Sequence, residues 1–158
     1  MIRRIAAFVL AAVIFVPVGA HAIDIRRVVS DKGIVAWFVP DKSVPVVALS
    51  FAFRNAGAAT DPAGKEGIAE MVTGLLDEGA GDLASQDYQR AVEEIAAQIS
   101  FDAGRDHFFG RLRTLSAERD RAFQLMRVAI NAPRFDAKTV ERVRGQILAG
   151  LQQQAESP

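Results

Sequence analysis

Few side chains in this sequence could carry out catalysis or bind a metal. The chain has no cysteine and two histidines, His21 and His107, which excludes thiolate ligands, disulfides and cysteine nucleophiles. Ser85 and Ser116 each precede a helical pattern and are interpreted as helix caps, because neither occurs in a nucleophile-elbow sequence. His107 begins an expected strand beside a turn. A role as lone ligand or base stays open there, but a structural role is the simpler interpretation.

The remaining candidates are carboxylates and aromatic residues. Glu70 and Asp77 are seven residues apart, so they would share one face of a helix. Two carboxylates on one face could touch a cation, but a solvated helix face is the simpler interpretation. The phenylalanines of two expected strands are interpreted as core residues rather than a ligand platform; they are Phe51, Phe53, Phe108 and Phe109.

The charge balance narrows the classes of partner. Nineteen basic residues face nineteen acidic ones in 158 residues, and no run of like charge occurs. This composition does not favour nucleic acid or an anionic membrane as a partner. Half of the residues are apolar and 24% are charged, which is typical of a globular domain.

Residues 1–22 have the pattern of a cleavable secretory signal. Arg3 and Arg4 precede an uninterrupted apolar run over residues 5–16, and Ala20-His21-Ala22 supplies the small-x-small cleavage pattern. A retained anchor is the alternative, but the run is short of the roughly 20 residues that span a bilayer. We expect an exported chain of residues 23–158, periplasmic or secreted, with no membrane contact after cleavage.

The elements expected after the signal are three strands, two helices, two strands and two helices. Apolar residues alternate in the strands, whereas a helical spacing recurs after Gly67, Ser85, Ser116 and Asp136. Grouped strands favour an α+β fold, a largely antiparallel sheet with helices packed on it. The strands are expected at 25–29, 34–39, 46–54, 99–103 and 107–115. The first helix is expected to bury Ile68, Met71, Val72, Leu75 and Leu76, and the last one Val140, Val143, Ile147, Leu148 and Leu151.

The segment 54–80 resembles the insulinase (pitrilysin) zinc peptidases, above all the bacterial members similar to mitochondrial processing peptidase. A strand is followed by a glycine-containing loop with an acidic residue, and Gly67-Ile68-Ala69 then opens a helix. The likeness continues through Ala132-Pro133-Arg134-Phe135 and into the last helix, so it covers essentially residues 23–158. It implies a peptidase-like α/β roll.

In that family the helix carries H-x-x-E-H, two zinc-binding histidines and the glutamate that activates water. The matching positions hold Glu70, Thr73 and Gly74, and the third ligand, a glutamate on the last helix, matches Gly150. Catalytic zinc needs three protein ligands. The resemblance therefore predicts no catalytic residue, no metal ligand and no cofactor in this chain, although active relatives bind zinc.

Family members usually contain two such domains, and in some a subunit without the zinc motif pairs with an active one. We therefore expect an incomplete domain, the front part of a longer protein or a truncated product. The favoured hypothesis is a non-catalytic subunit that binds extended peptide at a sheet edge and pairs with an active insulinase-family subunit. An active zinc metalloendopeptidase with ligands beyond residue 158 or from unusual residues, and a periplasmic adaptor or structural domain without peptide binding, stay open.

Overall fold

A computed structural model describes residues 23–156 and divides the chain between Ser43 and Val44 into two compact units. The predicted signal peptide, residues 1–22, lies outside the described residues. The first unit contains the predicted hairpin, formed by β1 (Arg26–Val29) and β2 (Val35–Phe38) in antiparallel register. Gly33 has a φ of +80° in the turn, a conformation that glycine adopts without strain.

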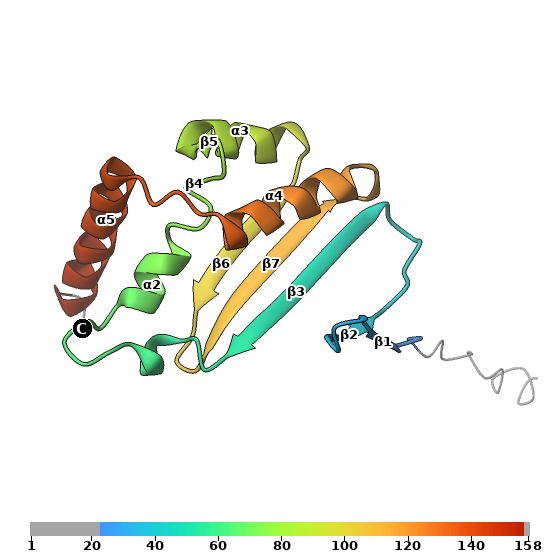
Figure 1. Ribbon diagram of the computed structural model, residues 1–158, viewed down its shortest axis with the longest axis horizontal. Coiled ribbons are helices and arrows are strands. Elements are labelled where there is room, and N and C mark those ends of the chain that lie inside the picture. Colours follow the sequence, from blue (N-terminus) through green and yellow to red (C-terminus); the bar gives the residue numbers. More distant parts are fainter. Residues whose placement is uncertain (1–22, 157–158) are drawn as a thin grey trace, which may run out of the picture. The chain divides into compact units, whose positions relative to one another are not determined.

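The second unit contains a three-stranded antiparallel sheet in the order β3-β7-β6 (Figure 1). The central strand is β7, so β3 and β6 are the edges of this sheet among the described residues. Alternation of large and small residues predicted the two long strands to the residue, because only one face packs against the core. The bounds are β3 Val46–Arg54, β6 Gln98–Ala103 and β7 His107–Leu115.

Two helices, α3 (Ser85–Glu94) and α4 (Arg119–Asn131), contribute buried residues to the core together with the sheet. A close approach between strands completes the core: a Cβ on Gly110 would lie 2.1 Å from Cζ of Phe51, so only glycine allows the ring to lie across β7. The spacing after Ser116 predicted a buried stripe on α4, and this is confirmed. The spacing after Ser85 predicted a stripe from Tyr88 to Ala96, in which Tyr88, Val92 and Ile95 are buried but Ala96 is exposed. The buried cluster comprises Ala80, Tyr88, Val92, Ile95, Leu112, Ala122, Leu125, Met126 and Ala129.

The remaining helices lie on the β6 side of the sheet (Figure 1). The short helix α2 (Ile68–Thr73) contacts both β6 and the long helix α5 (Ala137–Glu156). Most of the stripe predicted for the last helix is not buried: Val143 is 4% exposed, whereas Leu148 and Leu151 are 48% and 56% exposed. Two single turns of 3-10 helix precede α2 and α4, at Ala58–Thr60 and Ser116–Glu118.

Several local predictions were wrong. The helix expected over 68–76 ends at Thr73, and Ile68 is 42% exposed rather than buried. A small hairpin, β4 (Gly79–Ala80) with β5 (Leu83–Ala84), follows where only a helix end was expected. Phe53 is 52% exposed, whereas Phe51 packs against the core.

The serine caps were also wrong, because neither helix has a side-chain cap bond. Ser85 is the first residue of α3, and its hydroxyl donates to Glu78 instead. Ser116 begins a 3-10 turn that precedes α4. Asp136 does lie before α5, where its carbonyl accepts the hydrogen bond of the Val140 N–H, although its carboxylate accepts from Arg134.

Among residues 23–156, no helix has the length and apolar character needed to span a bilayer.

Candidate functional site

The candidate site lies on α2, whose N-terminal end is fixed by a residue of the preceding loop. The Asp61 carboxylate accepts the backbone N–H groups of Gly67 at 2.8 Å and Ala69 at 3.0 Å. It therefore satisfies two N–H groups that a helix start leaves without partners. Gly67, with a φ of +96°, lets the chain turn into the helix. The capping residue, Asp61, precedes Gly67 by six residues. A sequence search for a capping residue directly before the helix therefore does not find it.

The helix is short because its hydrogen-bond pattern changes at Gly74. The Gly74 N–H still donates to the Glu70 carbonyl at 3.0 Å, but the next N–H, from Leu75, donates to Val72 in the tighter 3-10 pattern. The Thr73 hydroxyl donates to the Glu70 carbonyl at 2.8 Å. Leu75 and Leu76 are buried in the turns that follow the helix.

The structure places the four positions matched to the zinc site in different surroundings. Glu70 is exposed, whereas Thr73 is only 5% exposed. Gly74 packs against α5, since a Cβ there would lie 3.1 Å from Cγ1 of Val143. Gly150 is exposed on α5, with no atom within 4 Å of its would-be Cβ. The first three positions share one segment, and Gly150 lies two turns beyond the residue that meets Gly74.

The donor chemistry of these positions does not fit a zinc ion. Only Glu70 offers a ligating side chain, since the Thr73 hydroxyl is bonded within its own helix and glycine has no side chain. Zinc sites use three or four ligands drawn from His, Cys and carboxylates. Within the described part of the chain, no three such side chains are grouped closely enough to hold a metal ion.

The other sequence candidates do not join this site. Asp77 lies in the turns beyond the end of α2 and is half-buried, so it does not share a helix face with Glu70. Burial raises the pKa of the Asp77 carboxyl. His107 begins β7 opposite Arg54 and stacks on Phe109, with 5.9 Å between the ring centroids.

A polar contact missed by the sequence interpretation joins the end of the α2 segment to two other helices. The Glu78 carboxylate lies 2.5 Å from the Arg142 guanidinium of α5 and accepts the Ser85 hydroxyl of α3 at 2.6 Å. Burial alone would raise the pKa of Glu78, but the two hydrogen bonds and the Arg142 charge hold it below its ordinary value. The partners are far apart in sequence, and no local pattern predicts their meeting.

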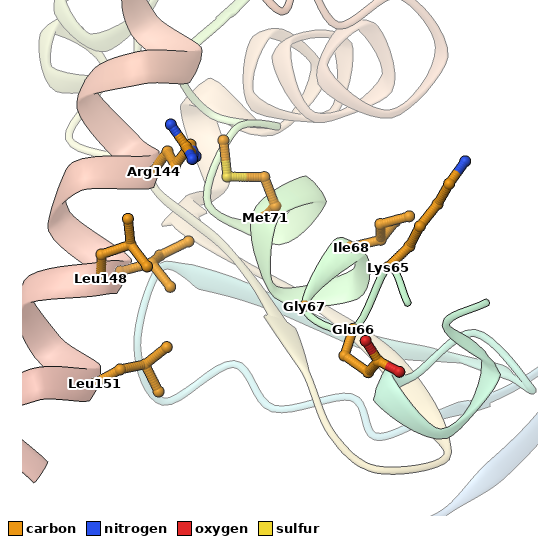
Figure 2. Close-up of a pocket in the computed structure, with 9 residues that line it drawn as sticks. Lys65, Glu66, Gly67, Ile68, Met71, Arg144, Leu148 and Leu151 are labelled. Carbon is orange, nitrogen blue, oxygen red and sulfur yellow. The ribbon is translucent and has the colours of Figure 1, made fainter. Parts of the chain in front are cut away.

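A groove of about 350 Å³ separates α2 from α5 (Figure 2). Its walls are mainly apolar and include Ile68 and Met71 of α2 and Ile147, Leu148 and Leu151 of α5. Lys65, Glu66 and Arg144 also line it. None of the four positions matched to the zinc site, Glu70, Thr73, Gly74 and Gly150, lines this groove.

The other neighbour of α2 is the edge strand β6. One side of β6 is paired with β7. Among residues 23–156, no backbone hydrogen bond joins the opposite side of β6 to another segment. That side presents N–H and C=O groups that an added strand could pair with.

The comparisons with known proteins agree with this arrangement. No protein-family model matches the sequence. The non-peptidase homolog YmxG of Helicobacter pylori is 26% identical over 110 residues, which is 70% of this chain and 25% of that protein. The crystal structure of a peptidase M16 inactive domain from Pseudomonas fluorescens matches with a TM-score of 0.78 and 25% identity, over 86% of this chain and 33% of that one.

A protease structure from Helicobacter pylori matches in fold, with a TM-score of 0.67 and 18% identity over 84% of this chain and 31% of that one. The chain therefore spans between a quarter and a third of the length of these relatives. The predicted α+β fold and the family resemblance are both confirmed. The chain is thus similar in fold and sequence to an inactive domain of the insulinase (peptidase M16) family and to a non-peptidase homolog, and the positions matched to the family's zinc site lack its ligands.

Proposed function

We propose that this domain binds extended peptide by strand addition to β6 and acts in the periplasm beside an active insulinase-family subunit that supplies the catalytic zinc. Relatives named as inactive or non-peptidase support the non-catalytic role. The signal pattern of residues 1–22 supports export.

The observation that carries the proposal is the contact between α2 and the edge strand β6. A peptide paired with β6 would run past the segment that holds Glu70, Thr73 and Gly74. The backbone would supply the affinity through main-chain hydrogen bonds, and alternate side chains would provide specificity. None of these contacts needs a metal, so peptide binding can persist where zinc ligands are absent.

The matched serines Ser50 and Ser100 provide a direct test. Both pair with Arg111, one on β3 and the other on β6, so they flank the central strand symmetrically. The chain has no cysteine, so Ser100→Cys and Ser50→Cys each give one site for a nitroxide label. The probe is an unlabelled peptide of alternating valine and threonine, followed by NMR.

Adjacent strands are about 4.8 Å apart, so a peptide on β6 lies next to position 100 and roughly three times farther from position 50. We expect the label at 100 to broaden the peptide signals strongly and the label at 50 to broaden them weakly. The reverse result would place the peptide on β3 and overturn the assignment to β6. Equal, weak broadening by both labels, or no binding to the unlabelled chain, would overturn strand addition altogether.

A separate experiment tests the partner. An insulinase-family protein from the same organism with an intact H-x-x-E-H should co-purify with this chain, and its peptidase activity should rise when the chain is added. A partner that neither associates with the chain nor changes its activity would contradict the paired-subunit part of the proposal, while leaving peptide binding to the previous test.

A further inference from the structure

The face of the sheet away from α4 carries two exposed arginines. Along β7, Leu112 and Thr114 are buried, whereas Arg111 and Arg113 alternate with them and are exposed. The register places short side chains beside the arginines. We call this the arginine face, formed by Arg111 and Arg113 with Ala48 and Ser50 of β3 and Gln98 and Ser100 of β6.

Neither Arg111 nor Arg113 forms a salt bridge with any residue that the structure describes, although seven other arginines do. A hollow of about 400 Å³ lies on the arginine face, between the two edge strands. The charge is local, because residues 23–158 have 17 basic and 19 acidic residues, a net charge of −2. The two guanidinium groups are therefore available to an anionic group from another molecule.

A peptide added to β6 would place alternate side chains on this same face. Its other side chains would lie on the side of Ile99 and Phe101, which are partly buried against the core. Apolar residues of the peptide favour that inner side, and this preference fixes which residues face outward, because the side-chain period of a strand is two. Ser100 is short, so it leaves room above β6 between Arg111 and the added strand.

We propose that this sheet selects extended peptides with carboxylate side chains at alternate positions, which pair with Arg111 and Arg113. The inference rests on the proposed strand addition to β6 and specifies the peptide that it takes. A peptide on β6 would lie roughly twice 4.8 Å from β7, a span that a long arginine and a glutamate side chain bridge together. Charge-assisted contacts of this kind are stronger than neutral ones.

The same face also sets a polarity along the peptide. Asp102 lies at the far end of β6, opposite Phe109 and beyond Ser100. It disfavours a carboxylate directly beside it and favours a basic or neutral residue there. The selected pattern is thus acidic next to Gln98 and Ser100 and not acidic next to Asp102.

The test compares three dye-labelled peptides on the full chain by fluorescence anisotropy. Each alternates valine with one other residue, which is glutamate, glutamine or lysine. We expect the glutamate peptide to bind about fivefold more tightly than the glutamine peptide, because exposed ion pairs contribute modestly, and the lysine peptide to bind least. The preference should shrink as salt is raised from about 0.05 to 0.5 M.

Two variants assign the preference to this face. In the double variant Arg111→Gln, Arg113→Gln, the glutamate and glutamine peptides should bind equally, with the glutamine affinity unchanged. Arg127→Gln removes an exposed arginine from α4, on the other side of the sheet, and should leave the fivefold preference intact. Circular dichroism checks that all variants fold.

The outcomes separate this inference from the proposed function. Binding of the glutamine peptide without a glutamate preference, or a preference that survives in the double variant, would overturn only the acidic selection. Failure of every peptide to bind would overturn both. Displacement by a thymidine oligonucleotide with equal affinity would show an unselective anion surface. A dimer of the wild-type chain that is lost in the double variant would show that the arginine face contacts a second copy. Either of these two results would also overturn the acidic selection.

Discussion

The Glu78 carboxylate and the Arg142 guanidinium lie 2.5 Å apart and join the segment after α2 to helix α5. The Ser85 hydroxyl, at the start of α3, donates a hydrogen bond to the same carboxylate at 2.6 Å. Glu78 retains 19% exposure of its side chain and Arg142 retains 46%. The pair is thus partly shielded from water. Without the Glu78 carboxylate, the Arg142 guanidinium and the Ser85 hydroxyl would both lose their acceptor.

Glu78→Gln is expected to lower the free energy of unfolding by about 1 kcal/mol at pH 7, the usual magnitude for a partly exposed charged hydrogen bond. The pKa of Glu78 is held below its ordinary 4.5 in the folded chain. Its contribution is therefore full above about pH 4.5 and is lost as the pH falls through the folded pKa. Urea titrations of both proteins at several pH values should converge at low pH. A difference that is constant from pH 7 to pH 3 would contradict this role.

Asp77→Asn is expected to have the opposite effect. Burial raises the pKa of Asp77 above its ordinary 3.8 in the folded chain, so the ionised form is destabilising. That penalty is full above the folded pKa and disappears below the unfolded value. Thermal melts should show the Asn variant to be more stable at pH 7 and no more stable near pH 3. Glu93→Gln, on the exposed face of α3, is the control and should change neither melt.

Gly74 and Val143 are expected to couple. Gly74 has a helical φ of −71°, so alanine is allowed there, but its Cβ would lie 3.1 Å from Cγ1 of Val143. We expect Gly74→Ala to destabilise the protein by about 1 kcal/mol through overpacking and to become neutral or stabilising when Val143 is also alanine. Gly150→Ala on α5 has open space and should stabilise by about 0.5 kcal/mol. Strict additivity of the Gly74 and Val143 changes would rule out the contact between these helices.

The sequence predicts the strands of the main sheet because their alternation reflects a single buried face. The residues of β3 and β7 show this plainly, and so do the stripes of α3 and α4. The end of α2 is not predictable in the same way. Leu75 and Leu76 keep a helical spacing and are buried, but they lie in turns because the hydrogen bonds tighten after Gly74.

Contacts between segments that are distant in the chain could not be predicted from the sequence alone. Two backbone hydrogen bonds hold the β4–β5 hairpin: the Gly81 N–H donates to the Ala132 carbonyl, and the Arg134 N–H donates to the Gly79 carbonyl. A Gly-Asp pair between two short runs was a local signal for it. Nothing local indicates that Arg142 meets Glu78, or that Asp61 caps α2. The residue types at the four zinc-site positions can be read from the sequence and compared with the family. The burial of those positions cannot be predicted from the sequence.

The purified chain is expected to hold no stoichiometric zinc. Glu70 is the one ligating side chain among the four matched positions, and a tight site needs at least three. Elemental analysis after dialysis against micromolar zinc measures this directly. One zinc per chain, retained through a second dialysis against zinc-free buffer, would show ligands that these positions do not supply.

The central claim is that this domain binds extended peptide without metal and without cleaving it. The most direct measurement follows one fluorogenic peptide by anisotropy and by cleavage, on the full chain, with zinc and then with a chelator. Binding should be the same in both conditions, because backbone pairing at β6 involves no metal ligand, and the peptide should be recovered intact. Binding that the chelator abolishes, or hydrolysis that zinc restores, would contradict the account.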